Sequence, residues 1–237
     1  NYYKINLVLI MNYKFEDVVV KIIYLSEVDF SVQISKSCIE QAKKFNVEVI
    51  PFQGIHGHNS SKFLKKFSLK PKYFFKNGRR GVVGCFLSHY LLWKECIKTQ
   101  RPYLILEHDG YFINKLPLKI LDSFDDVLKL DNESPYLENY DEKLAALKSF
   151  EVSKYYNPNA RDLDLNETGN YMHGAYSYII KPEGAEKLIL WINKNGFLPT
   201  DIQIGDKIVD IKVVKPTIVR LHPIYKNKVK LLSLTRR

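Results

Sequence analysis

The sequence predicts an α/β fold in which helices flank a Rossmann-like mixed sheet. Its 237 residues are 46% hydrophobic and 26% charged, a globular composition that excludes disordered, collagen-like and disulfide-scaffold chains. The first part of the chain alternates strand-like, helical and strand-like runs before a Gly-containing loop, which is typical of an α/β domain with parallel pairing. A buried helix followed by a short apolar strand continues the alternation. At roughly 150 residues per domain, the length favours one large domain, or one domain with a subdomain, over two equal halves.

Strands and one helix are expected near the N-terminus. Two runs rich in Val, Ile and Tyr are strand-like, Tyr3–Ile10 and Val18–Leu25. Val32–Phe45 carries apolar residues at three- and four-residue spacing, which predicts an amphipathic helix. Val47–Phe52 is expected to be a short buried strand, and the Gly-, Ser- and His-rich stretch Gln53–Ser61 a loop.

The middle of the chain predicts a buried helix that leads to a candidate site. Gly81–Lys98 has apolar residues on nearly every face, so the helix should be covered on most sides. Gly81 and Gly84 would let its first turn approach other backbone closely. Tyr103–Leu106 is expected to be a buried strand, and it runs directly into Glu107-His108-Asp109-Gly110. Acids at the carboxyl end of a central strand lie where open α/β sheets bind ligands.

The C-terminal half is expected to complete the domain, which we take to be residues 1–237 with a possible N-terminal extension at 1–16. Asp122–Asp164 shows little periodicity and is interpreted as short helices and loops. Strand-like composition returns later in the chain, around a helix that carries Pro182 in its first turn. The expected elements are the strand Asn170–Ile180, the helix Pro182–Ile192, and the strands Ile208–Val214 and Thr217–Leu221.

Charge is the unusual feature of the composition, because 36 Lys and Arg against 26 Asp and Glu give a net charge of +10. Lys62–Arg80 holds eight basic residues and no acid, and Gly205–Arg237 holds nine basic residues against two acids. The segment 121–167 reverses the sign, with twelve acids against five bases. Such segregation could steer an anionic partner to one region, or it could reflect solvated loops and helix ends. Nucleic acid is disfavoured, because no zinc-finger spacing, RNP-like motif or basic heptad accompanies the charge.

The cysteines point to a reducing compartment. Cys38, Cys85 and Cys96 form no CxxC pair. Cys85 and Cys96 would be about three helical turns apart on one helix, too far for a disulfide. No apolar run reaches the ~20 residues that span a bilayer. No basic-then-apolar leader opens the chain, so any signal peptide was removed or never existed. A cytoplasmic protein with buried free thiols is therefore expected.

Two kinds of side chain could carry chemistry. Glu107-x-Asp109 could present two carboxylates to one hard cation such as Mg²⁺ or Mn²⁺, or it could be an ordinary exposed turn. His89 could be a core histidine bonded to a backbone carbonyl or a functional group, and His222 could complete a metal site or belong to a loop. His56-Gly57-His58 is interpreted as exposed. The sequence has no G-x-S-x-G elbow, phosphate-binding P-loop or dinucleotide fingerprint, which disfavours lipases, ATPases and Rossmann oxidoreductases.

Several motifs in the same order resemble those of glycosyltransferase family 25, which includes lipooligosaccharide and procollagen galactosyltransferases. The strongest part is 81–112, where Gly81–His89 (GVVGCFLSH), a Trp-bearing helix and Tyr103–Phe112 (YLILEHDGYF) are similar to the central signature of the family. Gly174–Ile180 (GAYSYII) resembles its alanine-tyrosine strand, and Pro199-Thr200-Asp201 its Pro-x-Asp motif. The resemblance runs from about Ile22 towards the C-terminus.

This resemblance implies a GT-A-like fold, a UDP-sugar donor, Mn²⁺ or Mg²⁺, and inversion at the sugar carbon. Asp109 would bind the metal and Asp201 would be the general base that removes the acceptor proton. The metal would offset charge on the departing diphosphate. Together with the position of His222 in the sequence, the predicted site residues are Glu107, Asp109 and His222 for the metal, Gly84, Ser88, His89, Glu107 and His108 for the donor, and His173, Gly174 and Tyr176 for the acceptor.

Two positions depart from the pattern of the family. Its Asp-Asp pair is replaced by His108-Asp109, although hard oxygen ligands suit Mn²⁺ better than imidazole. The arginine-bearing loop that the family carries after its first strand is not evident in Ser26–Ser35.

Three functions follow from these observations. The first is transfer of a hexose, galactose or glucose, to a glycan, a lipooligosaccharide or hydroxylysine, with acceptor choice in the acidic insertion 121–167. A non-catalytic relative that binds nucleotide sugars or glycans is the second, and a basic nucleic-acid-binding protein the third. The basic clusters before Gly81 and at the C-terminus favour a diphosphate, or an anionic glycolipid or membrane surface in peripheral contact, as the anionic partner.

Overall fold

The computed structural model describes residues 17–72, 80–117, 119–131, 149–157 and 167–225. Within these ranges one seven-stranded mixed sheet, in the order β2-β1-β3-β7-β5-β8-β6, lies between two layers of helix, and β4 and β9 form a separate ribbon. The predicted α/β class is confirmed. The predicted strand Tyr3–Ile10 and most of the C-terminal basic residues lie outside the described ranges.

The described strands are β1 (Val19–Tyr24), β2 (Ile50–Gln53), β3 (Tyr103–Glu107), β4 (Gly110–Phe112), β5 (Val127–Lys129), β6 (Glu151–Lys154), β7 (Ser177–Ile180), β8 (Ile211–Lys215) and β9 (Val219–Leu221). The described helices are α1 (Asp29–Lys43), α2 (Ser60–Lys66), α3 (Arg80–Thr99), α6 (Pro182–Asn195) and α7 (Thr200–Gln203), with short 3₁₀ turns η2 (Gly57–Asn59), η4 (Ile120–Ser123) and η5 (Pro223–Tyr225).

The N-terminal half forms the expected parallel unit. β1 pairs in parallel with β2 on one side and with β3 on the other, and α1 makes the crossover between β1 and β2. α1 begins at Asp29, three residues before the predicted start, where an acid in the first turn favours a helix. Gln53–Ser61, predicted as a loop, instead contains η2 and the start of α2. There His56 Nδ1 accepts a hydrogen bond from the His58 amide, and Ser60 donates to the Gly57 carbonyl.

The predicted central helix and strand are confirmed as α3 and β3. The residues of β3 alternate between the two faces of the sheet, so that Ile105 packs in the core under α3 and Leu106 in the core over α1. The aromatic ring of Phe86 in α3 stacks on Phe197, with ring centroids 4.2 Å apart, and Trp93 is fully buried. Burial of each such side chain stabilises the fold by roughly 1.5–3 kcal/mol.

The acidic segment differs from the prediction of short helices and loops. It supplies two strands, β5 and β6, and β5 pairs with β7 on one side and β8 on the other. β5 is only three residues long and buried on both faces, so it has no polar alternation that a sequence pattern could detect. The predicted strand Asn170–Ile180 is strand only at β7, and the helix with Pro182 in its first turn is confirmed as α6.

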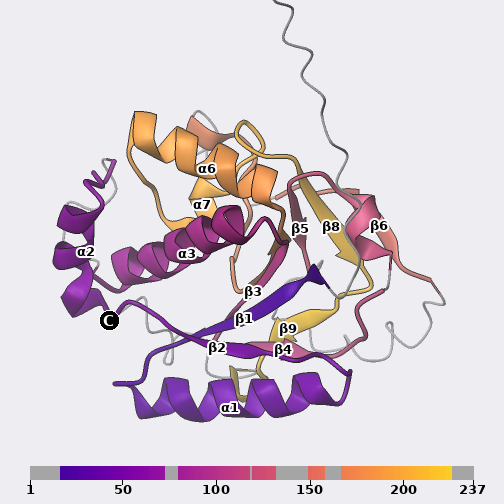
Figure 1. Ribbon diagram of the computed structural model, residues 1–237. Helices are drawn as coiled ribbons and strands as arrows, with labels where there is room; N and C mark the ends of the chain where they lie inside the picture. The colour runs from indigo at the N-terminus through magenta and orange to yellow at the C-terminus, as the bar shows by residue number, and fades with distance from the viewer. Residues whose placement is uncertain (1–16, 73–79, 118, 132–148, 158–166, 226–237) are drawn as a thin grey trace, which may run out of the picture.

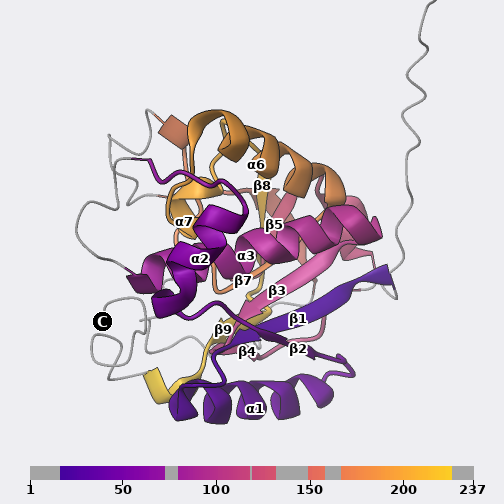
Figure 2. The same cartoon turned by 60° about the vertical axis from the view of Figure 1, so that its left-hand side comes forward.

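Helices cover both faces of the sheet. α3, α6, α7 and α2 cover one face of the sheet, and α1 lies against the other together with the β4–β9 ribbon (Figures 1 and 2).

No helix in the described part of the chain is both long enough and apolar enough to cross a membrane. All three cysteines are free, with Cys38 and Cys96 buried and Cys85 half-buried.

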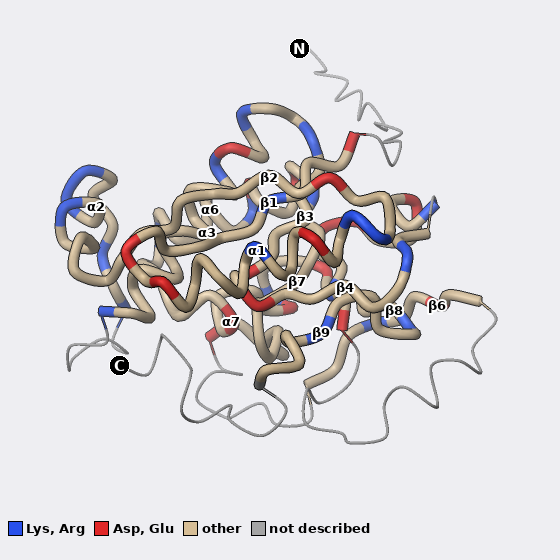
Figure 3. The backbone as a smooth tube through the Cα atoms, turned by 90° about the horizontal axis from the view of Figure 1, so that it is seen from below, with Lys and Arg blue, Asp and Glu red and all other residues tan. Residues whose placement is uncertain are grey.

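Basic residues gather on α2 and the loop after it (Figure 3). Lys62, Lys65, Lys66 and Lys70 are exposed there. Lys66 and the exposed Lys94 of α3 both place their ammonium groups over the ring of Phe67, 5.4 and 5.0 Å from its centroid. The basic cluster Lys62–Arg80 is therefore, in its described part, a solvent-facing surface at the edge of the α3 layer.

Candidate active site

The end of β3 is the centre of the candidate site. Glu107 is the last residue of the strand, and a two-residue turn, His108-Asp109, separates it from β4. The Glu107 amide donates a hydrogen bond to the Tyr176 carbonyl at 2.9 Å, which joins the strand end to the segment before β7. The expectation that these acids follow the carboxyl end of a central strand is confirmed, because β3 lies between β1 and β7.

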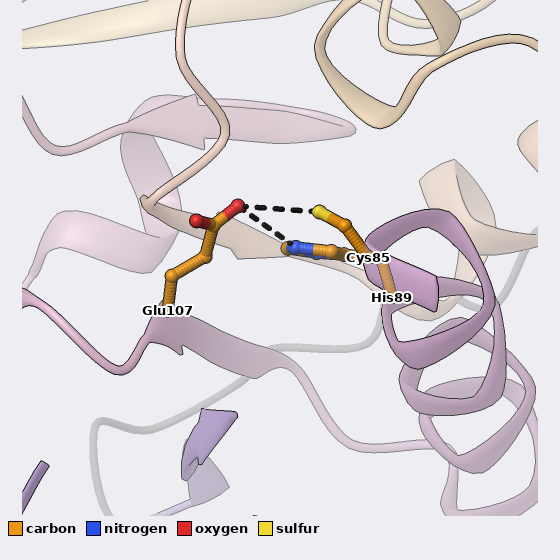
Figure 4. Close-up of side chains that lie close together, drawn as sticks. All are labelled: Cys85, His89 and Glu107. Atoms are coloured by element: carbon orange, nitrogen blue, oxygen red, sulfur yellow. Dashed lines mark hydrogen bonds and ion pairs between the residues drawn. The ribbon is translucent and has the colours of Figure 1, made fainter. Parts of the chain in front are cut away.

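The Glu107 carboxylate faces α3. Its Oε1 lies 3.4 Å from Nε2 of His89 and 3.5 Å from Sγ of Cys85 (Figure 4). The three potential ligand atoms all lie within 4.8 Å of one another, the one such group of three among the described residues. Cys85 and His89 are four residues apart, so they share a helix face. That spacing was the signal by which Cys85, not among the predicted site residues, could have been found.

His89 is held from behind by two aromatic residues. Its Nδ1 lies 2.8 Å from the hydroxyl of Tyr178, which also accepts a hydrogen bond from the indole N–H of Trp93 at 2.9 Å. His89, Trp93 and Tyr178 are fully buried. The prediction of a core histidine is therefore confirmed for His89, but its partner is the Tyr178 side chain and not a backbone carbonyl.

α7 brings a second carboxylate to the same side of the sheet. Thr200 Oγ1 lies 3.7 Å from Cys85 Sγ, and the next residue, Asp201, is close enough to Glu107 and His173 for their charges to shift its pKa. The Asp201 carboxylate accepts a hydrogen bond from the Ile202 amide at 3.1 Å. The contact between Cys85 of α3 and Thr200 of α7 therefore brings Asp201, the predicted base, to this end of the sheet.

The surroundings of Asp201, Glu107 and Cys85 shift their pKa values in different directions. Burial, opposed by the Ile202 amide, raises the pKa of Asp201, and the Glu107 charge raises it further. Burial also acts to raise the pKa of Glu107, but the hydrogen bond and charge of His89 outweigh it and hold that pKa below its ordinary value. Burial raises the pKa of Cys85 well above its usual range, so Cys85 is a neutral thiol. Glu107 is therefore an anion, and Asp201 is the more basic carboxylate.

Asp109 and His222 meet on the other side of the strand end. The antiparallel β4–β9 ribbon places them opposite each other, and the His222 amide donates to the Asp109 carbonyl at 2.8 Å. The His222 Nε2 lies 3.1 Å from the Ser37 hydroxyl, and its Nδ1 accepts from the Ile224 amide at 3.2 Å. Burial first, and then the charge of His108, lower the pKa of His222, so its imidazole is neutral near pH 7.

The predicted ligand set Glu107, Asp109 and His222 does not form one group of three ligand atoms among the described residues. Glu107 is grouped with Cys85 and His89 instead, and Asp109 and His222 are brought together by the ribbon. The two-residue turn after β3 is the physical reason, because it directs the acids into different surroundings.

The remaining predicted residues form two supporting groups. Ser88 Oγ accepts from the Ile55 amide and donates to the Gly84 carbonyl, both at 2.8 Å, so Gly84 and Ser88 hold the loop after β2 against α3. His173, Gly174 and Tyr176 belong to the segment before β7. The His173 amide donates to the Tyr155 hydroxyl at 3.0 Å, and Gly174 has a φ of +74°, which favours glycine.

Comparison with known proteins identifies the family of the chain. The family model described as glycosyltransferase family 25 (LPS biosynthesis protein) matches residues 24–204. The chain belongs to glycosyltransferase family 25. The match includes α3, β3 and α7, which carry the Glu107 and Asp201 side of the candidate site. Asp201 lies near the C-terminal end of the matched region, whereas His222 lies beyond it.

Curated relatives of this family 25 chain come from animals and a bacterium. The chain is 31% identical to human procollagen galactosyltransferase 2 over 153 residues, and 30% identical to the mouse protein over 152 residues. Each match covers 63% of this chain and 20% of the relative. The lipooligosaccharide biosynthesis protein lic2B of Haemophilus influenzae is 30% identical over 81 residues, covering 33% of this chain and 30% of the relative. The matched region thus spans a fifth to a third of these relatives.

Proposed function

We propose that the chain is an inverting glycosyltransferase that moves galactose or glucose from a UDP-sugar to a glycan, a lipooligosaccharide or hydroxylysine. The proposal is carried by one observation: in a family 25 chain, Cys85 contacts both Glu107 at the carboxyl end of β3 and Thr200, the residue before Asp201, and the charge of Glu107 reaches Asp201. The named activities of the galactosyltransferase and lipooligosaccharide relatives support the choice of substrate classes.

Asp201 is the proposed general base. The acceptor oxygen attacks the anomeric carbon as its proton passes to the Asp201 carboxylate, and the bond from that carbon to the UDP oxygen breaks, so that UDP leaves with the bonding electron pair. A base is most effective when its pKa approaches the working pH. The burial that raises the pKa of Asp201 therefore suits this role.

Mn²⁺ or Mg²⁺ is the proposed metal, and Asp109 would hold it. Its carboxylate offers the hard oxygen ligands that both ions prefer, whereas Glu107 is engaged by Cys85 and His89. His222 would bind the ion only on exchange of a ring hydrogen bond, because its Nδ1 accepts from the Ile224 amide and its Nε2 is bonded to Ser37. When bound, the metal would offset negative charge on the leaving diphosphate.

A basic surface on the protein points to anionic partners. The exposed lysines of α2 and the loop after it form a basic surface with no acid in its stretch of sequence. We propose that this surface attracts anionic glycolipids or the surface of an anionic membrane, with the protein cytoplasmic and peripheral.

The test is release of UDP from a panel of UDP-sugars, with and without Mn²⁺, by the wild type and matched variants. Asp201→Asn should lower kcat more than it raises the donor KM, and Asp109→Ala should abolish Mn²⁺-dependent turnover without loss of fold. Asp122→Asn, which changes an exposed carboxylate, is the control and should behave as the wild type.

Other outcomes favour the alternatives. If a UDP-sugar raises the Tm of the protein but none is turned over, the chain is a non-catalytic binding relative. If no donor binds and a salt-sensitive affinity for DNA or RNA appears, the basic surface serves nucleic acid instead.

A further inference from the structure

The group formed by Cys85, His89 and Glu107 has the dimensions of a zinc site. Zn²⁺ is bound tetrahedrally by sulfur at about 2.3 Å and by nitrogen or oxygen at about 2.0–2.2 Å. Such bonds place a nitrogen and an oxygen ligand about 3.4 Å apart, and a sulfur and an oxygen ligand about 3.6 Å apart. Glu107 Oε1 lies 3.4 Å from His89 Nε2 and 3.5 Å from Cys85 Sγ. One Zn²⁺ can therefore be bound by all three side chains with little movement.

His89 has a buried nitrogen that lacks a hydrogen-bond partner. The side chain is fully buried, and within the described residues no hydrogen bond reaches its Nε2. The approach of Nε2 to Glu107 Oε1 has the distance of an ion pair but not the geometry of a hydrogen bond. A buried polar atom in this state costs free energy. A metal ion bound by Nε2 and Glu107 would give that nitrogen a partner.

The other nitrogen of the His89 ring is fixed from behind. Nδ1 lies 2.8 Å from the Tyr178 hydroxyl oxygen, which also accepts a hydrogen bond from Trp93 at 2.9 Å. A histidine that binds a metal through one ring nitrogen usually donates the proton on the other to a fixed acceptor, which orients the ring. The Tyr178 oxygen is in place to accept that proton.

Exchange of protons for Zn²⁺ would leave the charge of the group unchanged. Without the metal, the charge of His89 offsets the Glu107 carboxylate, and Cys85 is a neutral thiol. With Zn²⁺, the negative ligands are the Glu107 carboxylate and the Cys85 thiolate, and the His89 ring is neutral. One proton leaves Sγ and one leaves Nε2 as the divalent ion enters, because metal binding requires deprotonated ligands. Binding therefore leaves no uncompensated charge in the interior.

We propose that Cys85, His89 and Glu107 form a zinc site that links α3 to the carboxyl end of β3, separate from Asp109. Thiolate and imidazole ligands favour Zn²⁺ over harder cations such as Mn²⁺ and Mg²⁺. Figure 4 shows the side chains of Cys85 and His89 extending from one helix face towards the same carboxylate oxygen. Cys85 is half-buried and the Glu107 side chain is 26% exposed, so the ion has a route from solvent. Water would be the fourth ligand.

Co²⁺ added to the chelator-treated chain tests the site, because cobalt bound to a thiolate has a strong near-ultraviolet absorption that cobalt bound only to oxygen and nitrogen lacks. We expect this absorption with wild-type protein, its loss when Zn²⁺ replaces Co²⁺, and its persistence in excess Mn²⁺. Absence of the absorption, or displacement of Co²⁺ by Mn²⁺ as readily as by Zn²⁺, would overturn the proposal.

Matched variants assign the ligands. Cys85→Ala should abolish the absorption, and Cys96→Ala, which removes a buried thiol from the same helix, should retain it. His89→Gln and Glu107→Gln should each weaken Co²⁺ binding at least tenfold, since even an outer partner of a metal ligand contributes about 10–100-fold. Absorption retained in Cys85→Ala contradicts the site. If Cys85→Ala does not fold, Glu107→Gln, at a partly exposed side chain, decides, because an unchanged affinity there is equally contradictory.

Zn²⁺ should also stabilise the fold, and Asp109→Ala gives the background for this measurement because it removes the proposed Mn²⁺ ligand. In Asp109→Ala, Zn²⁺ at about a hundredfold above its Kd should raise the Tm by about 5–10 °C. Addition of Cys85→Ala should remove that rise, and an equal rise in both proteins would refute the site.

The zinc site does not depend on the proposed function. If the chain turns over no UDP-sugar, the cobalt absorption and the Tm still decide whether these three residues bind zinc. If Zn²⁺ does not bind there, the proposed transfer by Asp201 is unaffected.

Discussion

Replacement of Lys129 by methionine should destabilise the protein by about 3–5 kcal/mol, because it leaves a buried carboxylate without its counter-ion. The side chains of Lys129 and Asp131 are 3% and 6% exposed and form an ion pair. The Lys129 ammonium also lies 3.4 Å from the Gly174 carbonyl and 5.3 Å from the centroid of the Tyr176 ring. It therefore joins β5 to the segment that carries the proposed acceptor residues.

The size of the loss should depend on pH. Burial raises the pKa of Asp131 above its ordinary value, and the charge of Lys129 is the largest influence that opposes this rise. Without Lys129 the pKa of Asp131 rises further. A carboxyl whose pKa is higher in the folded state contributes stability at low pH, and this contribution falls as the pH rises from the unfolded value, about 3.9, to the folded one. In the variant the slope is about 1.4 kcal/mol per pH unit across that widened window.

Urea denaturation at pH 5 and pH 8 measures both effects. Lys129→Met should lose more stability at pH 8 than at pH 5, relative to the wild type. Lys129→Met combined with Asp131→Leu should recover most of the loss, since an apolar pair removes the uncompensated charge. Lys43→Met, at an exposed ion pair with Glu40, is the control and should cost less than about 1 kcal/mol. A loss below about 1 kcal/mol for Lys129→Met, or no recovery in the double variant, would refute the reasoning.

Three further substitutions have defined outcomes. Gly84→Ala would place a Cβ 2.3 Å from the Ile55 carbonyl oxygen, and calorimetry should show a lower Tm, equivalent to about 1–3 kcal/mol of overpacking; an unchanged Tm would mean that α3 and the loop can separate. Because the pKa of Asp201 is raised, kcat/KM should increase with pH around a pKa higher than that of an ordinary aspartate, and this rise should be absent in Asp201→Asn; a rise that persists in that variant belongs to another group. His108→Asp, which restores the second acid of the family pattern, should preserve or raise Mn²⁺-dependent UDP release, and a large loss would show that His108 has a role of its own.

Local patterns in the sequence were sufficient for the framework of the site. The run of apolar residues in Gly81–Lys98 predicted α3, and the apolar strand that ends in acids predicted β3 with Glu107 at its carboxyl end, because both depend on neighbours in the chain. The family motifs were confirmed by the match over residues 24–204. β5 and β6 were missed, since strands as short as these depend on pairing with β7 and β8 more than on their own residues.

The sequence by itself determined the α/β class, the family and the identity of the acids at the end of β3. The tertiary structure alone decided which groups those acids meet. Glu107 contacts Cys85, 22 residues away, and Cys85 contacts Thr200, 115 residues away, because α3 packs over the strand end and α7 packs against α3. Asp109 meets His222 because β4 pairs with β9. Such contacts arise from the packing of distant elements, for which the spacing of residues along the chain carries no signal.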